Sequence, residues 1–246
     1  MACDGGKANE QQAGEKGAAG GQQSRVDLPR FPRAPSDAEN PRVRGSQNMT
    51  WSEFVQWAIV DADAKWQSDF GAASLVYTPV NYTIFWGHPV NSPECGLVKP
   101  SDGPIYCGLS DQRVYYPLEE EISNFGDFAV AFATAHEVGH HVQDELDILK
   151  QEDAGVYTSR QVELGADCLA GVWAYSVYSR NLLQKGDIEE AVRLEFTIGD
   201  LPGTSPTAPG AHGSSTERVE AFLAGYNNGN AGPCLAYTPA QEQTTG

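Results

Sequence analysis

Apolar side chains return every three or four positions in five segments of the chain, which is the pattern of amphipathic helices. Thr50 with Glu53, and Ser214 with Glu217, have the spacing of capping boxes at helix starts. Asp127 is expected to cap the second helix, because an Asp side chain can accept hydrogen bonds from the first free N–H groups. The predicted helices cover residues 50–66, 127–146, 159–183, 187–198 and 214–226.

A β-rich part lies between residues 75 and 117, where the helical periodicity stops. Tyr, Ile, Val and Phe side chains concentrate in two short runs, 82–86 and 113–116, separated by clusters of Gly, Pro, Asn and Ser. These runs predict strands, and residues 199–213 predict a Gly/Pro-rich loop. The fold class is therefore α+β, with a small sheet and a helical C-terminal half.

The two ends of the chain lack this pattern. Residues 1–48 contain almost no large apolar side chains and are rich in Gly, Gln, Ala and Pro, so we expect a disordered tail or membrane tether. Residues 49–235 are predicted to form one domain, and residues 236–246 to form a polar C-terminal tail.

The charge is strongly negative. The formal net charge is −17, and residues 49–246 alone hold nine basic against 27 acidic side chains. Such an acidic surface repels phosphate backbones, so we expect no nucleic acid as a partner of the folded part. The simpler explanation of the charge, which we prefer, is that it keeps an exported protein soluble.

Cys3 stands apart from the other four cysteines. The opening Met1-Ala2-Cys3, followed by Asp4 and Gly5, resembles a bacterial lipoprotein just after its signal sequence. A lipid on Cys3 would anchor the protein to a membrane, with the tail as its tether. The alternative is an ordinary exposed cysteine near the start of the chain.

The remaining four cysteines form an even set, which suits disulfide bonds and an extracytoplasmic, oxidising compartment. Three pairings are possible. We favour Cys95 with Cys107, because both lie in one Gly/Pro-rich stretch, and this leaves Cys168 with Cys234. The alternative is reduced, buried cysteines in a cytosolic enzyme, whereas a zinc knuckle is not expected because no CxxC spacing occurs.

The segment from His136 to His140 reads HExxH and lies on the second predicted helix. An interval of four residues places the two histidines on one helix face, where both can bind a single Zn²⁺ ion. Glu137 lies about 100° around the axis, which suits a general base that takes a proton from water and passes it to the leaving amine. Chance alone produces this motif in roughly one such chain in a hundred. A third ligand is therefore needed to distinguish a zinc site from a chance match.

The known HExxH patterns differ in the identity and position of the third zinc ligand. The longer pattern HExxHxxGxxH fails, because Gln143 and Leu146 occupy the Gly and His positions. Glu163 on the next predicted helix supplies a carboxylate ligand, and Asp167, one turn further on the same face, can hydrogen-bond a ligating histidine. Two solvated acids are the alternative, but the apolar neighbours of Asp167 indicate a face that points inward.

These blocks resemble the putative neutral zinc metallopeptidase family of bacteria, a group of zincins. The run AHEVGHHVQ at 135–143 is similar to its active-site helix, and VELGADCLAGVW at 162–173 is similar to its second helix block. The resemblance covers about residues 50–235 and implies a zincin-like fold. Gly165 departs from the family, which commonly has Gln there, and a glycine should loosen a helix interior by about 1 kcal/mol relative to Ala. Further matching blocks lie at residues 90–96, 106–115, 186–191 and 212–219.

Two other histidines lie close to these blocks. His141 follows a ligand directly, but a rotation of about 100° points it away from the metal, so we expect a supporting or core role. His212 lies in the loop before the last helix, where zincins commonly place a His or Tyr that stabilises the oxyanion. For His212 this catalytic role and a purely structural hydrogen bond stand as equal alternatives.

The preferred function is a zinc metalloendopeptidase, a hydrolase that cleaves peptide or protein substrates outside the cytoplasm. The substrate is expected to lie along an edge strand, for which residues 113–116 are the candidate. A cell-wall peptide amidase would use the same zinc and base on a different amide. The non-enzyme alternative is a zinc-binding exported lipoprotein that acts as a binding or assembly factor, but a structural zinc site needs no base such as Glu137.

Overall fold

The computed structural model describes residues 48–118, 120–235 and 237. The predicted α+β class is confirmed, with mostly helical structure and a small sheet. The long helices are α1 (Trp51–Ala72), α3 (Asp127–Glu145), α5 (Ser159–Ser179), α6 (Asp187–Ile198) and α7 (Ser215–Asn228). The short ones are α2 (Glu120–Ser123), α4 (Ile148–Asp153) and the 3₁₀ turns η1 (Pro100–Asp102) and η2 (Gly232–Cys234).

The start of α3 differs from the prediction. The capping position is Gly126, and Asp127 is the first helical residue. The carboxylate of Glu190, on α6, takes over the cap, because its Oε2 accepts a hydrogen bond of 2.9 Å from the N–H of Phe128. Both predicted capping boxes, at the starts of α1 and α7, are confirmed.

The end of α5 also differs, because the helix stops at Ser179 and not at residue 183. Asn181 adopts a left-handed conformation with φ of 58°. The N–H of Leu182 then donates to the carbonyl of Val177 at 3.1 Å, which completes a Schellman motif and terminates the helix.

The sheet contains three strands in the order β1-β5-β4. The central strand β5 (Arg113–Pro117) runs parallel to β1 (Asn81–Phe85) and antiparallel to β4 (Ile105–Cys107). The predicted strands at 82–86 and 113–116 are therefore confirmed, but the prediction that residues 113–116 form an edge strand is wrong. β4 is too short and too close to a Gly-rich loop to show in the sequence pattern, and it covers that edge.

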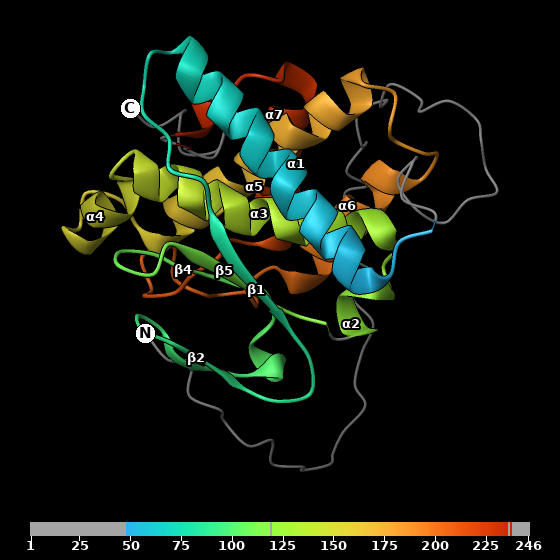
Figure 1. Cartoon of the computed structure of the whole chain (residues 1–246). Helices are drawn as coiled ribbons and strands as arrows, with labels where there is room; N and C mark the ends of the chain where they lie inside the picture. The colour runs from blue at the N-terminus through green and yellow to red at the C-terminus, as the bar shows by residue number, and fades with distance from the viewer. Residues whose placement is uncertain (1–47, 119, 236, 238–246) are drawn as a thin grey trace, which may run out of the picture. The chain divides into compact units, whose positions relative to one another are not determined.

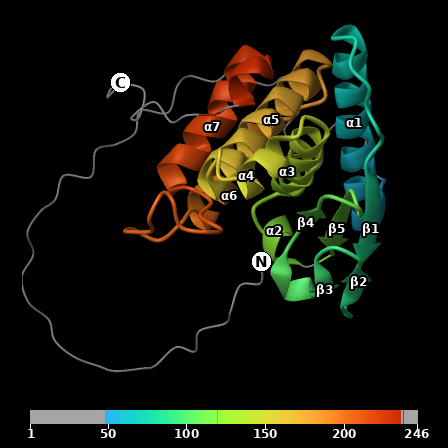
Figure 2. The same cartoon turned by 90° about the vertical axis from the view of Figure 1, so that its left-hand side faces the viewer.

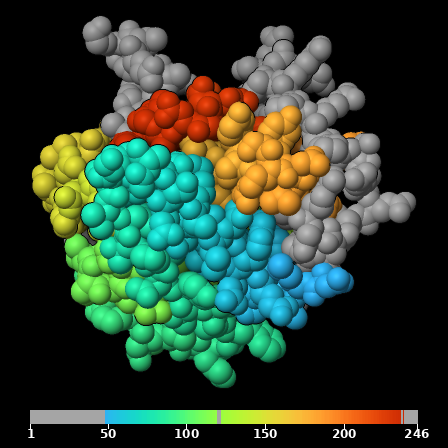
Figure 3. All heavy atoms as spheres, turned by 45° about the horizontal axis from the view of Figure 1, so that its top comes forward, coloured from blue at the N-terminus to red at the C-terminus, as the bar shows by residue number. Residues whose placement is uncertain are grey.

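Four long helices pack side by side in the order α1, α3, α5 and α7, with the sheet against α1 and α3 (Figures 1 and 2). Figure 3 shows the face on which α1, in blue and cyan, separates the green sheet region from the orange and red C-terminal part. α5 and α7 lie in close contact at Gly171 and Gly225. A Cβ atom at Gly171 would lie 2.1 Å from the carbonyl oxygen of Phe222, so this crossing requires glycine.

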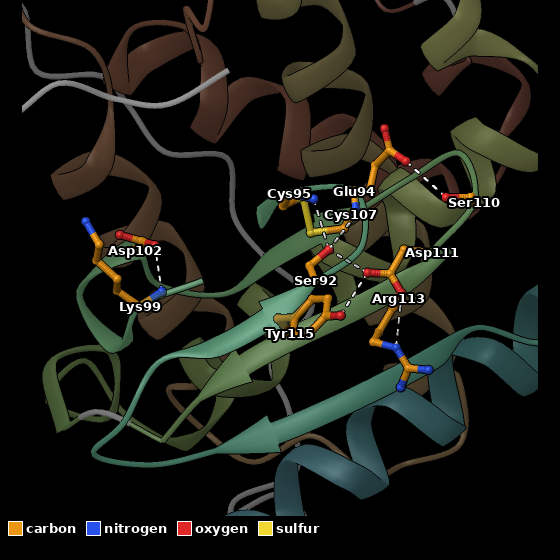
Figure 4. Close-up of a disulfide and its surroundings, with 10 residues drawn as sticks. All are labelled: Ser92, Glu94, Cys95, Lys99, Asp102, Cys107, Ser110, Asp111, Arg113 and Tyr115. Atoms are coloured by element: carbon orange, nitrogen blue, oxygen red, sulfur yellow. Dashed lines mark hydrogen bonds and ion pairs between the residues drawn. A yellow bond between two sulfur atoms is a disulfide. The ribbon is translucent and has the colours of Figure 1, made fainter. Parts of the chain in front are cut away.

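Two disulfides join Cys95 to Cys107 and Cys168 to Cys234, which confirms the expectation of disulfide bonds and favours an extracytoplasmic location. The first ties β4 to a hairpin formed by β2 (Val90–Ser92) and β3 (Gly96–Val98), as Figure 4 shows. The buried Asp111 reinforces this link, because its Oδ2 accepts hydrogen bonds from Ser92 (2.6 Å) and Tyr115 (2.8 Å).

Cys3 and the predicted N-terminal tail lie outside the described residues apart from position 48, and so does the predicted C-terminal tail apart from position 237. Among the helices of the described part, none combines the length and the apolar character needed to cross a membrane.

Candidate metal centre

His136, His140 and Glu163 bring three potential ligand atoms together at the contact between α3 and α5. The Nε2 atoms of the histidines lie 3.1 Å apart, and the carboxylate oxygens of Glu163 lie 3.3 Å from His136 and 3.5 Å from His140. A tetrahedral zinc ion with bonds of about 2.1 Å holds its ligand atoms about 3.4 Å apart. The three side chains therefore fit one zinc ion, and they form a group able to hold a metal.

Hydrogen bonds orient both imidazole rings so that Nε2 faces this shared point. His136 Nδ1 lies 2.6 Å from Asp167 Oδ1, and His140 Nδ1 lies 2.9 Å from the amide oxygen of Gln143. Both partners accept hydrogen bonds, so each Nδ1 carries the proton and each Nε2 keeps its lone pair for a metal.

Gly165 makes room for the side chain that orients His140. Gln143 donates from Nε2 to the carbonyl of Val162 at 2.7 Å, and a Cβ at position 165 would lie 2.7 Å from that same nitrogen. It would also lie 2.9 Å from the carbonyl oxygen of Cys234. The glycine therefore has a packing role, in addition to the intrinsic helix cost expected from its propensity.

A buried charge network supports Asp167 from the other side. Arg218, on α7, donates to both carboxylate oxygens of Asp167 at 2.9 Å, and its Nε lies 2.8 Å from Oε2 of Glu195 on α6. Burial raises the pKa of Asp167, but the charges of Arg218 and His136 outweigh it and lower this pKa overall. Burial and the charge of Asp167 raise the pKa of Glu195 well above its usual value, which favours its neutral form.

The electrostatic balance of the centre favours positive charge. Burial lowers the pKa of His136 and of His140, but the nearby carboxylates outweigh it and raise both values. The pKa of Glu163 is held well below its usual value by the two histidines, against the effect of burial. A metal cation can supply the positive charge that protons supply on the imidazoles.

Glu137 lies beside this centre and contacts the sheet. Its side chain is almost buried, with 8% of the residue exposed, and burial raises the pKa of its carboxyl group. The backbone of Tyr106, in β4, lies near the carboxylate and lowers this pKa, against the larger effect of burial. Glu137 thus lies between α3 and β4, with a pKa shifted in the direction that makes a carboxylate a better base.

His141 takes no part in the group of metal-binding atoms. Its Nε2 lies 2.7 Å from the carbonyl oxygen of Thr78, and its Nδ1 lies 3.0 Å from the hydroxyl of Tyr106. Tyr106 in turn donates to Asp144 at 2.9 Å. This buried chain of contacts fixes β4 against α3.

His212 lies in the loop between α6 and α7, and its side chain is 47% exposed. The N–H groups of His212 and Gly213 donate to Oδ2 of Asp200 at 2.9 and 2.8 Å, and the His212 ring lies 3.8 Å from Oδ1. Gly213 packs against Leu164, the neighbour of Glu163. The loop is therefore anchored next to the third candidate ligand, although His212 itself is not part of the group of metal-binding atoms.

The site has the arrangement that defines one class of metal-binding protein, in which HExxH on one helix meets a carboxylate from a later helix. The chain belongs to the putative neutral zinc metallopeptidase family, and the sequence model of that family matches residues 28–237. It is 29% identical to the uncharacterized protein YpfJ of Escherichia coli K12 over 206 residues, which are 76% of this chain and 71% of the relative. It is 28% identical to the uncharacterized protein Rv2575 of Mycobacterium tuberculosis over 222 residues, 77% of this chain and 73% of the relative. No solved structure matches it.

Sequence reasoning missed several residues of the centre. In the sequence, Gln143 is only a mismatch to the longer zinc pattern, and Arg218 lies in the matching block 212–219, which assigns it no role. Glu195 and Asp200 gave no local signal, because an acidic residue on an amphipathic helix or in a loop is ordinarily solvated. A buried acid such as Asp167 requires a buried base, and this requirement is the signal that points to Arg218.

Proposed function

We propose that this protein is a zinc-dependent endopeptidase, in which His136, His140 and Glu163 bind Zn²⁺ and Glu137 is the general base. The observation that carries the proposal is the set of ligand-atom separations, 3.1, 3.3 and 3.5 Å, with both Nε2 atoms directed to one point. Three protein ligands leave a fourth position open, which is the arrangement of catalytic rather than structural zinc.

Zinc bound here supplies a Lewis acid, which polarises a carbonyl group and acidifies water. Glu137 takes the proton from the attacking water and delivers it to the leaving nitrogen of the peptide. Its burial supports this role, because a raised pKa brings the carboxyl group closer to the pH at which it must both accept and release a proton.

Asp167 fixes the tautomer and the orientation of His136, and Gln143 does the same for His140. His212 is the candidate donor to the oxyanion that forms during attack. Its anchored loop, held by Asp200 and packed on Leu164, supports this assignment.

The peptide substrate lies along β4. This strand pairs with β5 on one side only, and within the described residues no further strand covers its other edge. Its Tyr106 also contacts Glu137, so an extended peptide added to this edge passes the base. β4 therefore replaces residues 113–116 as the candidate substrate strand.

The protein works outside the cytoplasm, as a secreted enzyme or as a lipoprotein held through Cys3. Residues 49–235 form the catalytic domain, with residues 1–48 as the tether and residues 236–246 as a polar tail. The disulfides support this location.

The test compares native protein with Glu137→Gln for zinc content, melting temperature and hydrolysis of casein. Gln keeps the shape of the side chain but cannot take a proton, so hydrolysis should fall about 10²- to 10⁴-fold while zinc content and stability persist. Equal hydrolysis by both forms, or native protein purified without chelator that contains no zinc, would overturn the proposal. Cell-wall fragments are assayed alongside casein, and cleavage of the fragments alone would identify an amidase.

A further inference from the structure

A cavity of ≈ 380 Å³ lies where the loop after α6 meets the starts of α5 and α7. In Figure 2 this loop is the orange segment that follows α6. Two of the lining residues, Phe196 and Leu201, are apolar and are 63% and 81% exposed. The lining includes Arg160, Phe196, Asp200, Leu201, Pro202 and Pro206.

The cavity begins one helical turn from a candidate zinc ligand, although none of the three ligands lines it. Arg160 lies three residues before Glu163 on α5, a rise of about 4.5 Å on the same helix face. Gly213 also lines the cavity, and its backbone packs on Leu164, the residue after Glu163. Since neighbouring residues of an extended peptide are about 3.3 Å apart, a residue next to the scissile bond can reach this cavity.

The walls are held in place by contacts that do not depend on a ligand. Asp200 closes the neck of the loop through its hydrogen bonds to the N–H groups of His212 and Gly213. The hydroxyl of Ser159 accepts a hydrogen bond from the N–H of Gly210 at 3.2 Å. The loop that lines the cavity is thus held in place without a ligand, and a preformed cavity is typical of binding sites.

The charges where the starts of α5 and α7 line the cavity favour an apolar ligand. The guanidinium of Arg160 pairs with Glu217, and Glu217 is also tied to Ser214 by a capping box at the start of α7. With that cation paired to Glu217, the carboxylate of Asp200 is left to repel acidic side chains. Phe196 and Leu201 then offer the free contact surface, and this surface is apolar.

We infer that this cavity is a specificity pocket for a large apolar side chain, such as Phe or Leu, next to the scissile bond of the peptide substrate. The inference rests on the proposed endopeptidase function. It adds the substrate class and names Phe196 and Leu201 as the residues that select it.

The experiment uses a host peptide whose cleavage site is mapped first by mass spectrometry. Residues on each side of that bond are then replaced in turn by Phe, Leu, Ala or Glu, and kcat/KM is measured. At one position Phe or Leu should exceed Ala by about 10- to 100-fold, with Glu below Ala. Leu201→Asp and Phe196→Asp should reduce this ratio to within about threefold. Both side chains are mostly exposed, so the substitutions should leave folding intact.

Val60→Asp is the matched control, because Val60 is 52% exposed on α1, which contributes nothing to the cavity lining. It should keep the native ratio. The inference would be overturned if native protein cleaved Phe, Leu and Ala peptides with equal kcat/KM at every position. It would also be overturned if Leu201→Asp and Phe196→Asp both kept the native preference for Phe or Leu over Ala.

Binding of the same peptides to zinc-loaded Glu137→Gln separates failure of the pocket from failure of the proposed function. If Phe peptides bind more tightly than Ala peptides and lose that advantage when Leu201→Asp is added, the pocket stands even if native protein hydrolyses nothing. If hydrolysis is found without any such preference, the endopeptidase stands and the pocket is wrong.

Discussion

Asp167→Asn tests whether the buried charge network supports the metal centre. Asp167 is completely buried and joins His136 to Arg218 through three contacts of 2.6 to 2.9 Å. Asn has nearly the same shape but carries no charge, and one of its two accepting oxygens becomes an NH₂ donor. The substitution therefore weakens the orientation of His136 and leaves Arg218 without its main counter-charge.

Asp167→Asn should lower both the affinity for the metal and the folding stability. Loss of the partner of a ligating histidine typically costs 10- to 100-fold in metal affinity, or about 1.4 to 2.8 kcal/mol. Removing one member of a buried ion pair costs about 3 to 5 kcal/mol of folding stability, and the lower end applies here because Glu195 can ionise beside Arg218. For a domain of this size, about 3 kcal/mol lowers Tm by roughly 6 to 12 °C.

The assays measure zinc affinity by competition with a chromogenic chelator and thermal unfolding of the metal-free protein. Asp61→Asn is the control, because Asp61 also binds an arginine through both oxygens, with Arg180 nitrogens at 2.6 and 2.7 Å. Arg180 is half-exposed, so this pair should contribute only about 1 kcal/mol or less, and zinc affinity should not change. The reasoning is refuted if Asp167→Asn binds zinc as tightly as native protein, or if Asp61→Asn weakens zinc equally.

Two further predictions concern stability. Burial, together with the charges of Asp127 and Glu190, raises the pKa of Asp187 to about 8. The folded state then binds more protons than the unfolded state between about pH 4 and 8, so stability falls as the pH rises through this window. Asp187→Asn should flatten this fall in denaturant unfolding near pH 5 and 8.5, and an equal slope in both proteins would contradict it. Replacing Cys168 and Cys234 by Ala should lower the free energy of unfolding by about 4 kcal/mol, and replacing Cys95 and Cys107 should lower it by about 3 kcal/mol. The first loss is larger because the two disulfides close loops of 66 and 12 residues. Denaturant unfolding in which the second pair costs more than the first would contradict this loop-closure argument.

The sequence predicted the parts of the fold that depend on local patterns. The capping boxes at Thr50 and Ser214 and the limits of α6 rest on neighbouring residues and are confirmed. The cap of α3 and the order of the sheet were not predictable in this way. Glu190 reaches α3 from a helix that begins 60 residues after Asp127, and β4 displaces β5 from the edge with a strand of three residues.

The candidate site divides in the same way. The spacing of His136, Glu137 and His140 is a property of one helix, and Glu163 with Asp167 is a property of another. The sequence therefore indicated the chemistry of each helix. What it did not indicate is how the two helices and the sheet are held together, since Arg218, the bond from Gln143 to the carbonyl of Val162 and the Tyr106 backbone act through contacts between elements.

The first turn of α7 links the block around His212 to the candidate metal centre, although no residue of this block belongs to the group of His136, His140 and Glu163. Within five consecutive positions, Ser214 caps the helix, Glu217 pairs with Arg160 one turn from Glu163, and Arg218 binds Asp167. His212 lies two residues before Ser214, so its position relative to the candidate metal ligands is set by the same helix start. A change that shifts α7 along its axis would therefore disturb the orientation of His136 and the placement of His212 together.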